Sequence, residues 1–539
     1  MFKRLTVLVL IFAFSFSVAS CASQTNIQQP VETPTITTTA APTGVGTLKL
    51  AFCANDSLNP YSAQSKMNKQ LSSLMFDPLV KLDNNLNPNL ILAEKVEVSG
   101  KSCTVTLKSV MFSDGSYVRG EDVVTSYNLA ITSPNSIYPS QLSNVASCNS
   151  DGQKIVFTLK SNDPNFSNLL DFPIIKSGTH NRKNADNKIL PPIGSGRYVF
   201  NYENGDYSLK PNSKYHDKVS ENYVKLVNIP DNEAWQYAVR SNDVDIFYSG
   251  EDTTNLPSFT GGTTQIKHTD LIYLNVSDNS QILSNNNLKR AIYDVINRKQ
   301  ITESAFYTYA YSAVNLFPET VKFAENTYTG LSPYGNSETA NEYMLNAEYS
   351  TKNDQGIFLD KNNNPLKLKL LYNKSLSGHK STAIVISEQL RKFGIDTELV
   401  ELESVSYVKR ISSGNYDLAI FEIKLNKNLD LNALFDFEKT VVETTTAQTS
   451  NDENKEKVES NEDSGKFNAK TLSKVKSAYL DYLSGKTKIT DFMNIYFENI
   501  PFIPICYRSG LTGYSQTASI AAVSSVSDAY YNFQSISAK

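Results

Sequence analysis

The histidines and cysteines are the residues best suited to metal or nucleophilic chemistry, and their spacing argues against both. Four histidines lie in four separate segments, at His180, His216, His268 and His379, and the five cysteines form no CxxC pair. A zinc site needs several such ligands close together. Gly194-Ser195-Gly196 also lacks the spacing of a nucleophile elbow. We therefore expect no metal site, no cofactor and no catalytic residues.

One cysteine has a distinctive setting near the start of the chain. Lys3-Arg4 precede an uncharged apolar run from Leu5 to Val18, which has the length of a signal h-region and is short for a membrane span. The run ends in Val18-Ala19-Ser20-Cys21, which resembles the lipobox of bacterial lipoproteins. That resemblance implies a signal peptide over residues 1–20 and a lipidated Cys21. The alternative is a plain secretory signal with an incidental cysteine.

This resemblance also implies a location at the cell membrane. The chain would be lipid-anchored on the extracytoplasmic face, with acyl chains on Cys21 holding it stably. Residues 21–47, rich in Gln, Thr, Pro and Ala, cannot bury enough apolar surface to order themselves. We predict a disordered tether there. A second biased stretch at about 440–466 is expected to be a disordered insertion, with an exposed charged helix over 451–458 as the alternative.

Charge and length narrow the function classes further. The chain has 539 residues, with 51 Lys and Arg against 55 Asp and Glu, a net charge of −4. Removing the two signal-peptide cations leaves −6. Such an acidic balance gives no electrostatic basis for binding nucleic acid. At 40% hydrophobic residues the chain is globular, and its length favours two or more packed lobes.

Two segments show the two-residue period of half-buried strands. Val105 and Leu107 alternate with polar residues, and Ile155, Phe157 and Leu159 follow the same pattern, which predicts a sheet rich in antiparallel pairs. Cys103 and Cys148 each begin an expected strand of this region. They form either a disulfide or two free buried thiols.

The middle of the chain alternates strand-like and helix-like segments. Residues 366–371, 395–402 and 416–421 are strand-like, while 383–393 and 405–411 carry helical apolar stripes. Another helical stripe runs from Leu288 to Ile296. The βαβαβ order predicts a parallel sheet with right-handed crossovers. Open sheets of this kind bind ligands at the carboxyl ends of their strands.

Several motifs together resemble one family. The run from Thr104 to Tyr127 is similar to the signature of family 5 extracellular solute-binding proteins, the peptide- and nickel-binding group of ABC importers. Pro192 to Tyr198, Leu288 to Ile301 and Asn499 to Pro504 resemble further family segments in the same order. The chain departs from the family at Arg119-Gly120, where Thr-Ala is usual, so the helix that follows loses its expected N-cap.

The resemblance implies an α/β fold of the two-lobe periplasmic-binding-protein type, a clamshell with mixed sheets and an extra subdomain in the first lobe. Lobe I would span 48–270, with the subdomain at about 76–189, and lobe II would span 271–498. Residues 499–539 would return into lobe I. The two crossings are expected near Tyr273–Val276 and Ile500–Tyr507. Ligand would then be held between the lobes.

Ligand contacts are also implied by the resemblance. In peptide-binding relatives an acidic residue follows the strand that corresponds to 416–421, and here Asp430 is the candidate and Glu422 the substitute. The lone Trp235 could cover a ligand ring or pack in the core. The full set of expected ligand contacts is Tyr61, Trp235, Tyr273, Asn275, Glu422 and Asp430.

The function implied is that of a membrane-anchored, monomeric receptor. It would capture a small solute, oligopeptides above all, and deliver it to the permease subunits of an ABC importer. Alternatives are an exported hydrolase, a sensory lipoprotein, or a receptor for an oligosaccharide or a metal complex. Sugar binders commonly stack their ligands on tryptophan, so a single Trp weighs against an oligosaccharide.

Overall fold

The computed structural model describes residues 47–184, 189–219, 223–250, 258–327, 330–435, 469–519, 524–526, 528–533 and 537–538. The expected signal peptide, Cys21, all but the last residue of the tether, and the insertion at about 440–466 lie outside these ranges. Across the described part of the chain, helices are too short or too polar to span a bilayer.

Two four-stranded sheets and three helices share the first hydrophobic core, which includes Leu50, Val105, Phe157 and Trp235. One sheet has the order β1-β10-β9-β8, with β1 and β10 parallel and the other pairs antiparallel. The other is wholly antiparallel, in the order β4-β5-β7-β6, as the alternating pattern predicts. The elements are β1 (Leu48–Phe52), β4 (Ala93–Ser99), β5 (Ser102–Leu107), β6 (Val145–Asp151), β7 (Lys154–Leu159), β8 (Tyr198–Glu203), β9 (Asp206–Pro211), β10 (Val224–Asn228), α1 (Lys66–Met75), α2 (Gly120–Thr132) and α3 (Asn232–Arg240).

Helix α2 begins where the chain departs from the family pattern. Arg119 is its N-cap and contributes no side-chain cap, but the Arg119 backbone N–H donates to Asp122 Oδ2 at 2.8 Å. A Cβ on Gly120 would lie 2.7 Å from the Gly152 carbonyl oxygen. The close approach of Gly120 to that backbone therefore requires glycine. The Asp122 side chain caps the start of the helix by accepting the hydrogen bond from the Arg119 backbone N–H.

The larger sheet has the order β11-β19-β12-β18-β16-β17, with β13 beside β19. Its parallel part is the predicted βαβαβ unit, in which β16 pairs in parallel with both β17 and β18. The elements are β11 (Ile246–Ser249), β12 (Thr263–Val276), β13 (Ala310–Ser312), β16 (Lys367–Asn373), α7 (His379–Phe393), β17 (Asp396–Leu402), α8 (Ser404–Ser412), β18 (Leu418–Lys424) and β19 (Phe502–Tyr514).

Both faces of this sheet are buried. Along β12, Ile272 and Leu274 belong to a second core cluster, whereas Leu271 and Tyr273 belong to a third. Alternate residues of a strand point to opposite faces, so one strand contributes to both clusters. The remaining elements are η1 (Phe166–Leu169), η2 (Ile282–Ser284), η3 (Lys322–Thr327), α4 (Asn286–Val295), α5 (Arg298–Phe306), α6 (Ser337–Asn346), α9 (Asn432–Phe435), α11 (Ala469–Leu483), α12 (Ile489–Asn499), β2 (Val80–Leu82), β3 (Pro88–Leu90), β14 (Thr351–Lys352), β15 (Phe358–Leu359), β20 (Ala518–Ser519) and β21 (Ser537–Ala538).

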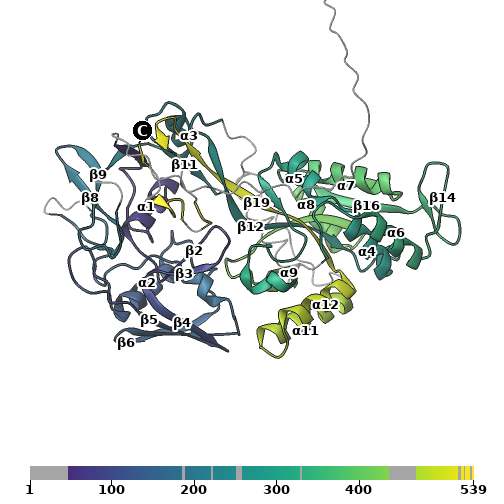
Figure 1. Ribbon diagram of the computed structural model, residues 1–539, viewed down its shortest axis with the longest axis horizontal. Coiled ribbons are helices and arrows are strands. Elements are labelled where there is room, and N and C mark those ends of the chain that lie inside the picture. Colours follow the sequence, from purple (N-terminus) through teal and green to yellow (C-terminus); the bar gives the residue numbers. More distant parts are fainter. Residues whose placement is uncertain are drawn as a thin grey trace, which may run out of the picture. The chain divides into compact units, whose positions relative to one another are not determined.

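The long antiparallel strands β12 and β19 connect the first core cluster to the other two (Figure 1). Ile266 and Leu511 are buried in the first cluster, while Ile272 and Ile503 are buried in the second. The pairing register shifts between Lys267 and Leu271. The change from one core to the next thus falls on this irregularity, a few residues before the expected crossing at Tyr273–Val276.

Cys103 and Cys148 are separate free thiols. Both residues pair with Phe157, Cys103 from β5 on one side of β7 and Cys148 from β6 on the other. Two strand spacings amount to about 10 Å, which exceeds the Cα separation a disulfide can bridge. In the structure Cys103 and Cys148 are therefore two free buried thiols and not a disulfide.

Candidate functional site

A cavity of about 580 Å³ lies between residues of the first core's elements and residues of β12, the end of β18 and the segment that follows it. Its volume falls within the range of small-molecule sites in proteins. The lining residues are Lys66, Lys69, Gln70, Ser72, Ser73, Phe76, Pro78, Lys81, Ile137, Tyr138, Ser140, Gln141, Asp171, Pro173, Tyr248, Gly250, His268, Thr269, Lys424, Leu425, Asn426, Lys427, Val526 and Asp528.

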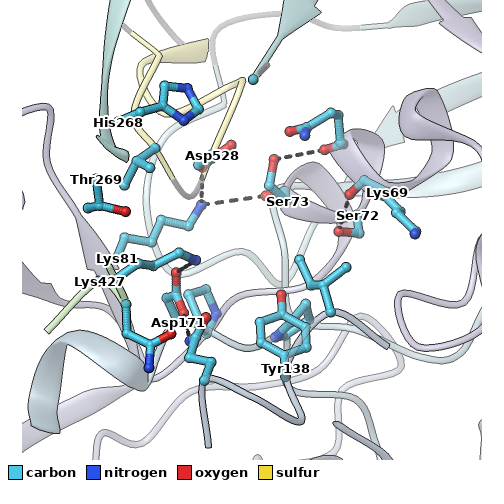
Figure 2. Close-up of a pocket in the computed structure, with 18 of the residues that line it drawn as sticks. Lys69, Ser72, Ser73, Lys81, Tyr138, Asp171, His268, Thr269, Lys427 and Asp528 are labelled. Carbon is cyan, nitrogen blue, oxygen red and sulfur yellow. Dashed lines mark hydrogen bonds and ion pairs between the residues drawn. The ribbon is translucent and has the colours of Figure 1, made fainter. Parts of the chain in front are cut away.

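Helix α1 forms one wall. Its apolar residues Met67, Leu71 and Leu74 are fully buried in the core, so the intervening polar residues lie on the other side. Lys66 and Lys69 are among the cavity-lining residues of this polar side, and Figure 2 shows Lys69 with Ser72 and Ser73 beside the cavity.

A buried ion pair lies at one side of the cavity. Lys81 Nζ is 3.0 Å from Asp528 Oδ2, and both side chains are less than a tenth exposed (Figure 2). Burial alone would raise the pKa of Asp528, but Lys81 beside it holds that pKa below its usual value. Lys81 Nζ also reaches the Ser73 carbonyl oxygen at 3.5 Å. This pair links strand β2 to the C-terminal segment of the chain.

A second ion pair joins the two sides of the cavity. Lys427 Nζ donates to Asp171 Oδ2, and Gln141 Nε2 donates to the other oxygen of the same carboxylate at 2.7 Å. Asn168 Nδ2 donates to the Lys427 carbonyl oxygen at 3.2 Å. The carboxylate of Asp171 is therefore held by two donors in a nearly dry position.

The segment after β18 and the middle of β12 complete the wall. Thr269 Oγ1 donates to the Leu425 carbonyl oxygen at 2.6 Å, which ties the two segments together. His268 is buried, with its Nδ1 3.7 Å from Asp270 Oδ2. Tyr138 and Tyr248 supply aromatic surface to the same cavity. Burial raises the pKa of Tyr138 well above its usual value, so its hydroxyl stays neutral.

Four of the six expected ligand contacts lie in the core and not in the cavity lining. The Tyr61 hydroxyl donates to the Pro173 carbonyl oxygen, and Trp235 Nε1 donates to the Ile246 carbonyl oxygen at 2.8 Å. Tyr273 packs between aromatic rings, and Asn275 Nδ2 donates to the Tyr416 hydroxyl at 2.7 Å. All four are at most 3% exposed. The structure places Trp235 in the first core cluster, which is the alternative to a ligand contact.

The two acidic candidates are also outside the lining, and each has partners of its own. Glu422 lies on β18 with Arg508 Nη2 2.9 Å from its Oε2 and His379 Nε2 3.4 Å away. Burial alone would raise the pKa of Glu422, but His379 and Arg508 lower it to about 2. Asp430 Oδ1 accepts from the Tyr479 hydroxyl at 3.0 Å.

The lysines of the lining are the functional candidates that sequence reasoning missed. An acid was expected after the strand at 416–421, yet β18 ends with Lys424 on the cavity and the segment after it adds Lys427. A signal was available, because Lys66 and Lys69 repeat the same three-residue spacing at the start of a helix. In the described ranges no group of three or more His, Cys, Asp or Glu is placed to hold a metal ion.

Comparisons with known proteins define the class. The sequence profile of the bacterial extracellular solute-binding proteins, family 5 middle region, matches residues 85–438. The chain therefore belongs to this family. Its fold is the mixed α/β, two-lobe clamshell of periplasmic binding proteins, with an extra subdomain in the first lobe, as the resemblance implied.

Individual relatives are distant. The oligopeptide-binding protein AppA of Bacillus subtilis is 24% identical over 389 residues, covering 64% of this chain and 67% of that protein. The nickel-binding periplasmic protein of Escherichia coli is 24% identical over 366 residues, covering 64% and 69%. A solved ABC transporter substrate-binding protein from Sinorhizobium meliloti superposes with a TM-score of 0.63 at 18% identity, covering 92% of this chain and 100% of that one.

Proposed function

We propose that this chain captures a small solute, oligopeptides above all, and delivers it to the permease subunits of an ABC importer. The observation that carries the proposal is the 580 Å³ cavity, whose walls come from the first core's elements and from β12, the end of β18 and the segment that follows it. A ligand there would contact both groups of elements. Its binding energy would then favour the arrangement that brings them together.

Peptides are favoured over nickel as the solute. Relatives of both kinds are known, and the described residues offer no His, Cys and carboxylate cluster for a bare metal ion. The cavity instead combines aromatic surface from Tyr138 and Tyr248 with many polar groups, which suits an amide backbone and varied side chains. The chain is proposed to act by binding, as a monomer, and to leave its ligand chemically unchanged.

Membrane attachment through Cys21 is part of the proposal. It is supported by the small residues before Cys21 and by the apolar run before them. The test is fractionation of cells that express the wild-type chain or Cys21→Ala, with labelled palmitate in the medium. Label and membrane association should both be lost in the variant. A wild-type chain that stays unlabelled would overturn this part of the proposal.

The binding role is tested on the purified chain from Ala22 onward. Mass spectrometry of molecules released on denaturation identifies a carried solute, and melting is measured with peptide panels and growth-medium extracts. A ligand at a hundredfold excess over its dissociation constant adds about 2.7 kcal/mol to the free energy of unfolding. Any peptide that binds should be recovered intact after incubation with the chain. Cleavage of the peptide would favour the alternative function of an exported hydrolase.

A matched pair of variants locates the site. Ser140 is exposed at the cavity lining, so Ser140→Trp places an indole at its edge without burying it in the core. Ser350 is equally exposed and lies outside the lining, which makes Ser350→Trp the control. Ligand-induced stabilisation should fall only in Ser140→Trp. An equal response of both variants would place the binding site elsewhere.

A further inference from the structure

The tip of the β2–β3 hairpin leaves the core in which the hairpin begins. Leu79 and Val80 are buried in the first core cluster, whereas Leu82 and Leu86 are buried in the third. Within the described part of the chain, the other buried residues that make up the third cluster all lie at residue 271 or later. The hairpin therefore inserts two apolar side chains among residues that come much later in the sequence.

The backbone at Leu86 is unusual for an apolar residue. Its φ is 62°, in the left-handed region that glycine and asparagine adopt most readily, and its side chain is 2% exposed. Asp83 Oδ1 fixes the turn by accepting from the backbone N–H groups of Asn85 and Asn87 at 2.8 and 2.9 Å. A turn that faced only solvent would have no use for leucine in this conformation. The strained backbone at Leu86 therefore serves the contact of its side chain with the third core.

Polar contacts surround the apolar tip. The Lys322 backbone N–H donates to Asn87 Oδ1 at 3.3 Å, and Asn87 Nδ2 donates to the Thr320 carbonyl oxygen at 3.4 Å. Lys267 Nζ donates to Asn85 Oδ1 at 3.0 Å. Apolar burial at the centre with hydrogen bonds around it is the composition of a specific contact between two surfaces.

Asn168 connects this tip to the wall of the cavity. Its Nδ2 donates to the Leu86 carbonyl oxygen at 3.0 Å and to the Lys427 carbonyl oxygen at 3.2 Å, and the residue is 4% exposed. Lys427 lines the cavity, as does Lys81, the residue before Leu82. The contacts of the hairpin tip are therefore made directly beside the cavity.

We propose that the tip of the β2–β3 hairpin, residues 82–87, is a latch that holds the two walls of the cavity together before any solute is bound. All of its contacts are made between residues of the chain itself. Release of the latch would open the cavity. Bound solute and the closed latch would then favour the same arrangement, and a chain that is already closed needs less binding energy to reach it.

The test is hydrogen exchange, followed by mass spectrometry, on the purified chain without solute. Segments 320–324 and 425–431, which meet the hairpin tip and Asn168, should be protected in the wild type. Leu86→Ala should speed exchange in both segments at least about tenfold, because a buried leucine side chain contributes that much or more to a contact. Exchange in strands β5 and β7 should stay at the wild-type rate, since the first core remains folded.

Matched variants separate the latch from a general loss of stability. Leu92→Ala removes the same atoms from a residue that is 1% exposed and belongs to the first core cluster, and it should leave exchange in both segments unchanged. Asn87→Ala is milder, because it loses only the two side-chain hydrogen bonds across the contact, and it should speed exchange at 320–324 about threefold. Asn89→Ala, at an exposed position of β3, should have no effect.

Three results would overturn the latch. They are free exchange of both segments in the wild type, unchanged exchange in Leu86→Ala, and equal effects of Leu86→Ala and Leu92→Ala. If Leu86→Ala does not fold, the comparison of Asn87→Ala with Asn89→Ala decides. All of these measurements are made without solute, so the proposed receptor function stands or fails separately.

Discussion

Lys427 and Asp171, 256 residues apart in the sequence, form an ion pair across the cavity. The Asp171 side chain is 2% exposed and that of Lys427 17% exposed, so the carboxylate depends on this partner and on Gln141. Removing one member of such a pair costs more than the pair contributes, because a buried charge is left without its counter-charge.

Lys427→Ala should therefore lower the free energy of unfolding by about 2–3 kcal/mol, a value below the usual cost because Lys427 is partly exposed. Urea unfolding at neutral pH measures the change. Lys424→Ala, three residues earlier and exposed, serves as the control and should cost less than about 0.5 kcal/mol. Equal effects of the two substitutions would show that the ion pair contributes nothing special.

Asp163 should make stability depend on pH. Burial raises its pKa to about 6, and the charge of Asp430 raises it too, although Asn428 Nδ2 donates to its carboxylate at 2.7 Å. Because the folded pKa lies above the unfolded value, the stabilising contribution is complete at low pH and is lost as pH rises through about 6. Asp163→Asn keeps an acceptor for Asn428 and removes the titration.

Between pH 4 and pH 7 the free energy of unfolding of the variant should rise by about 2 kcal/mol relative to that of the wild type, because the wild-type carboxyl must ionise in a buried position over this range. Denaturant unfolding at several pH values measures this difference. Asp151→Asn, at an exposed position, provides the comparison and should show no such trend. A pH-independent difference for Asp163→Asn would contradict the prediction.

Glu422 should act in the opposite sense. Its pKa is lowered to about 2 in the folded chain, so its contribution is present above the unfolded value and disappears as pH falls through about 2. Glu422→Gln leaves Arg508 without its carboxylate partner and should lower the free energy of unfolding by about 2–4 kcal/mol at pH 7. Exposed Glu398→Gln is the matched control. The deficit should shrink on acidification, and a constant deficit would be contrary to the assignment.

Trp235 should report on folding and not on ligand. It is 1% exposed, stacks edge-on against Phe247 and donates to the Ile246 carbonyl oxygen. Trp235→Phe should lower the free energy of unfolding by about 1–3 kcal/mol, since that carbonyl loses its donor. Solute affinity should stay within about twofold of wild type, as measured by calorimetry. A large loss of solute affinity in a folded Trp235→Phe variant would show that Trp235 contributes to ligand binding.

The thiols should remain free. In the chain from Ala22 onward, only Cys53 is partly exposed, and burial raises the pKa of Cys103 and Cys148 to about 12. An alkylating reagent should label Cys53 in the folded chain and reach Cys103, Cys148 and Cys506 only after unfolding. Mass spectrometry of labelled peptides, with and without reductant, gives the count. A pair of cysteines released only by reductant would show a disulfide.

Local periodicity was enough to predict much of the fold. The alternating residues around Val105 and Phe157 form adjacent antiparallel strands, and the stripe over 383–393 forms helix α7. Gly394, with φ at 122°, ends that helix as its type suggests. These features depend on residues a few positions apart, which is the range that a sequence displays directly.

The site could not be predicted in the same way. Lys69 and Lys427 line one cavity only because α1 and the segment after β18 are brought together by the whole fold. Aromatic residues such as Tyr61 and Trp235 are equally suited to a core and to a ligand wall, so their type alone does not distinguish the two. The acid expected after β18 was inferred from relatives, and in this chain Lys424 and Lys427 are on the cavity lining whereas Glu422 and Asp430 are outside it.

Strand β19 also determines when the chain can fold. Phe502, Ile503 and Leu511 of this strand lie in the third, second and first core clusters respectively, and Tyr530 and Phe533 complete the first. Without these residues, each of the three cores lacks part of its packing. Strand β19 pairs with β12, which lies more than 200 residues earlier in the chain. Contacts this distant in sequence form slowly. Completion of all three cores therefore requires the chain as far as Phe533.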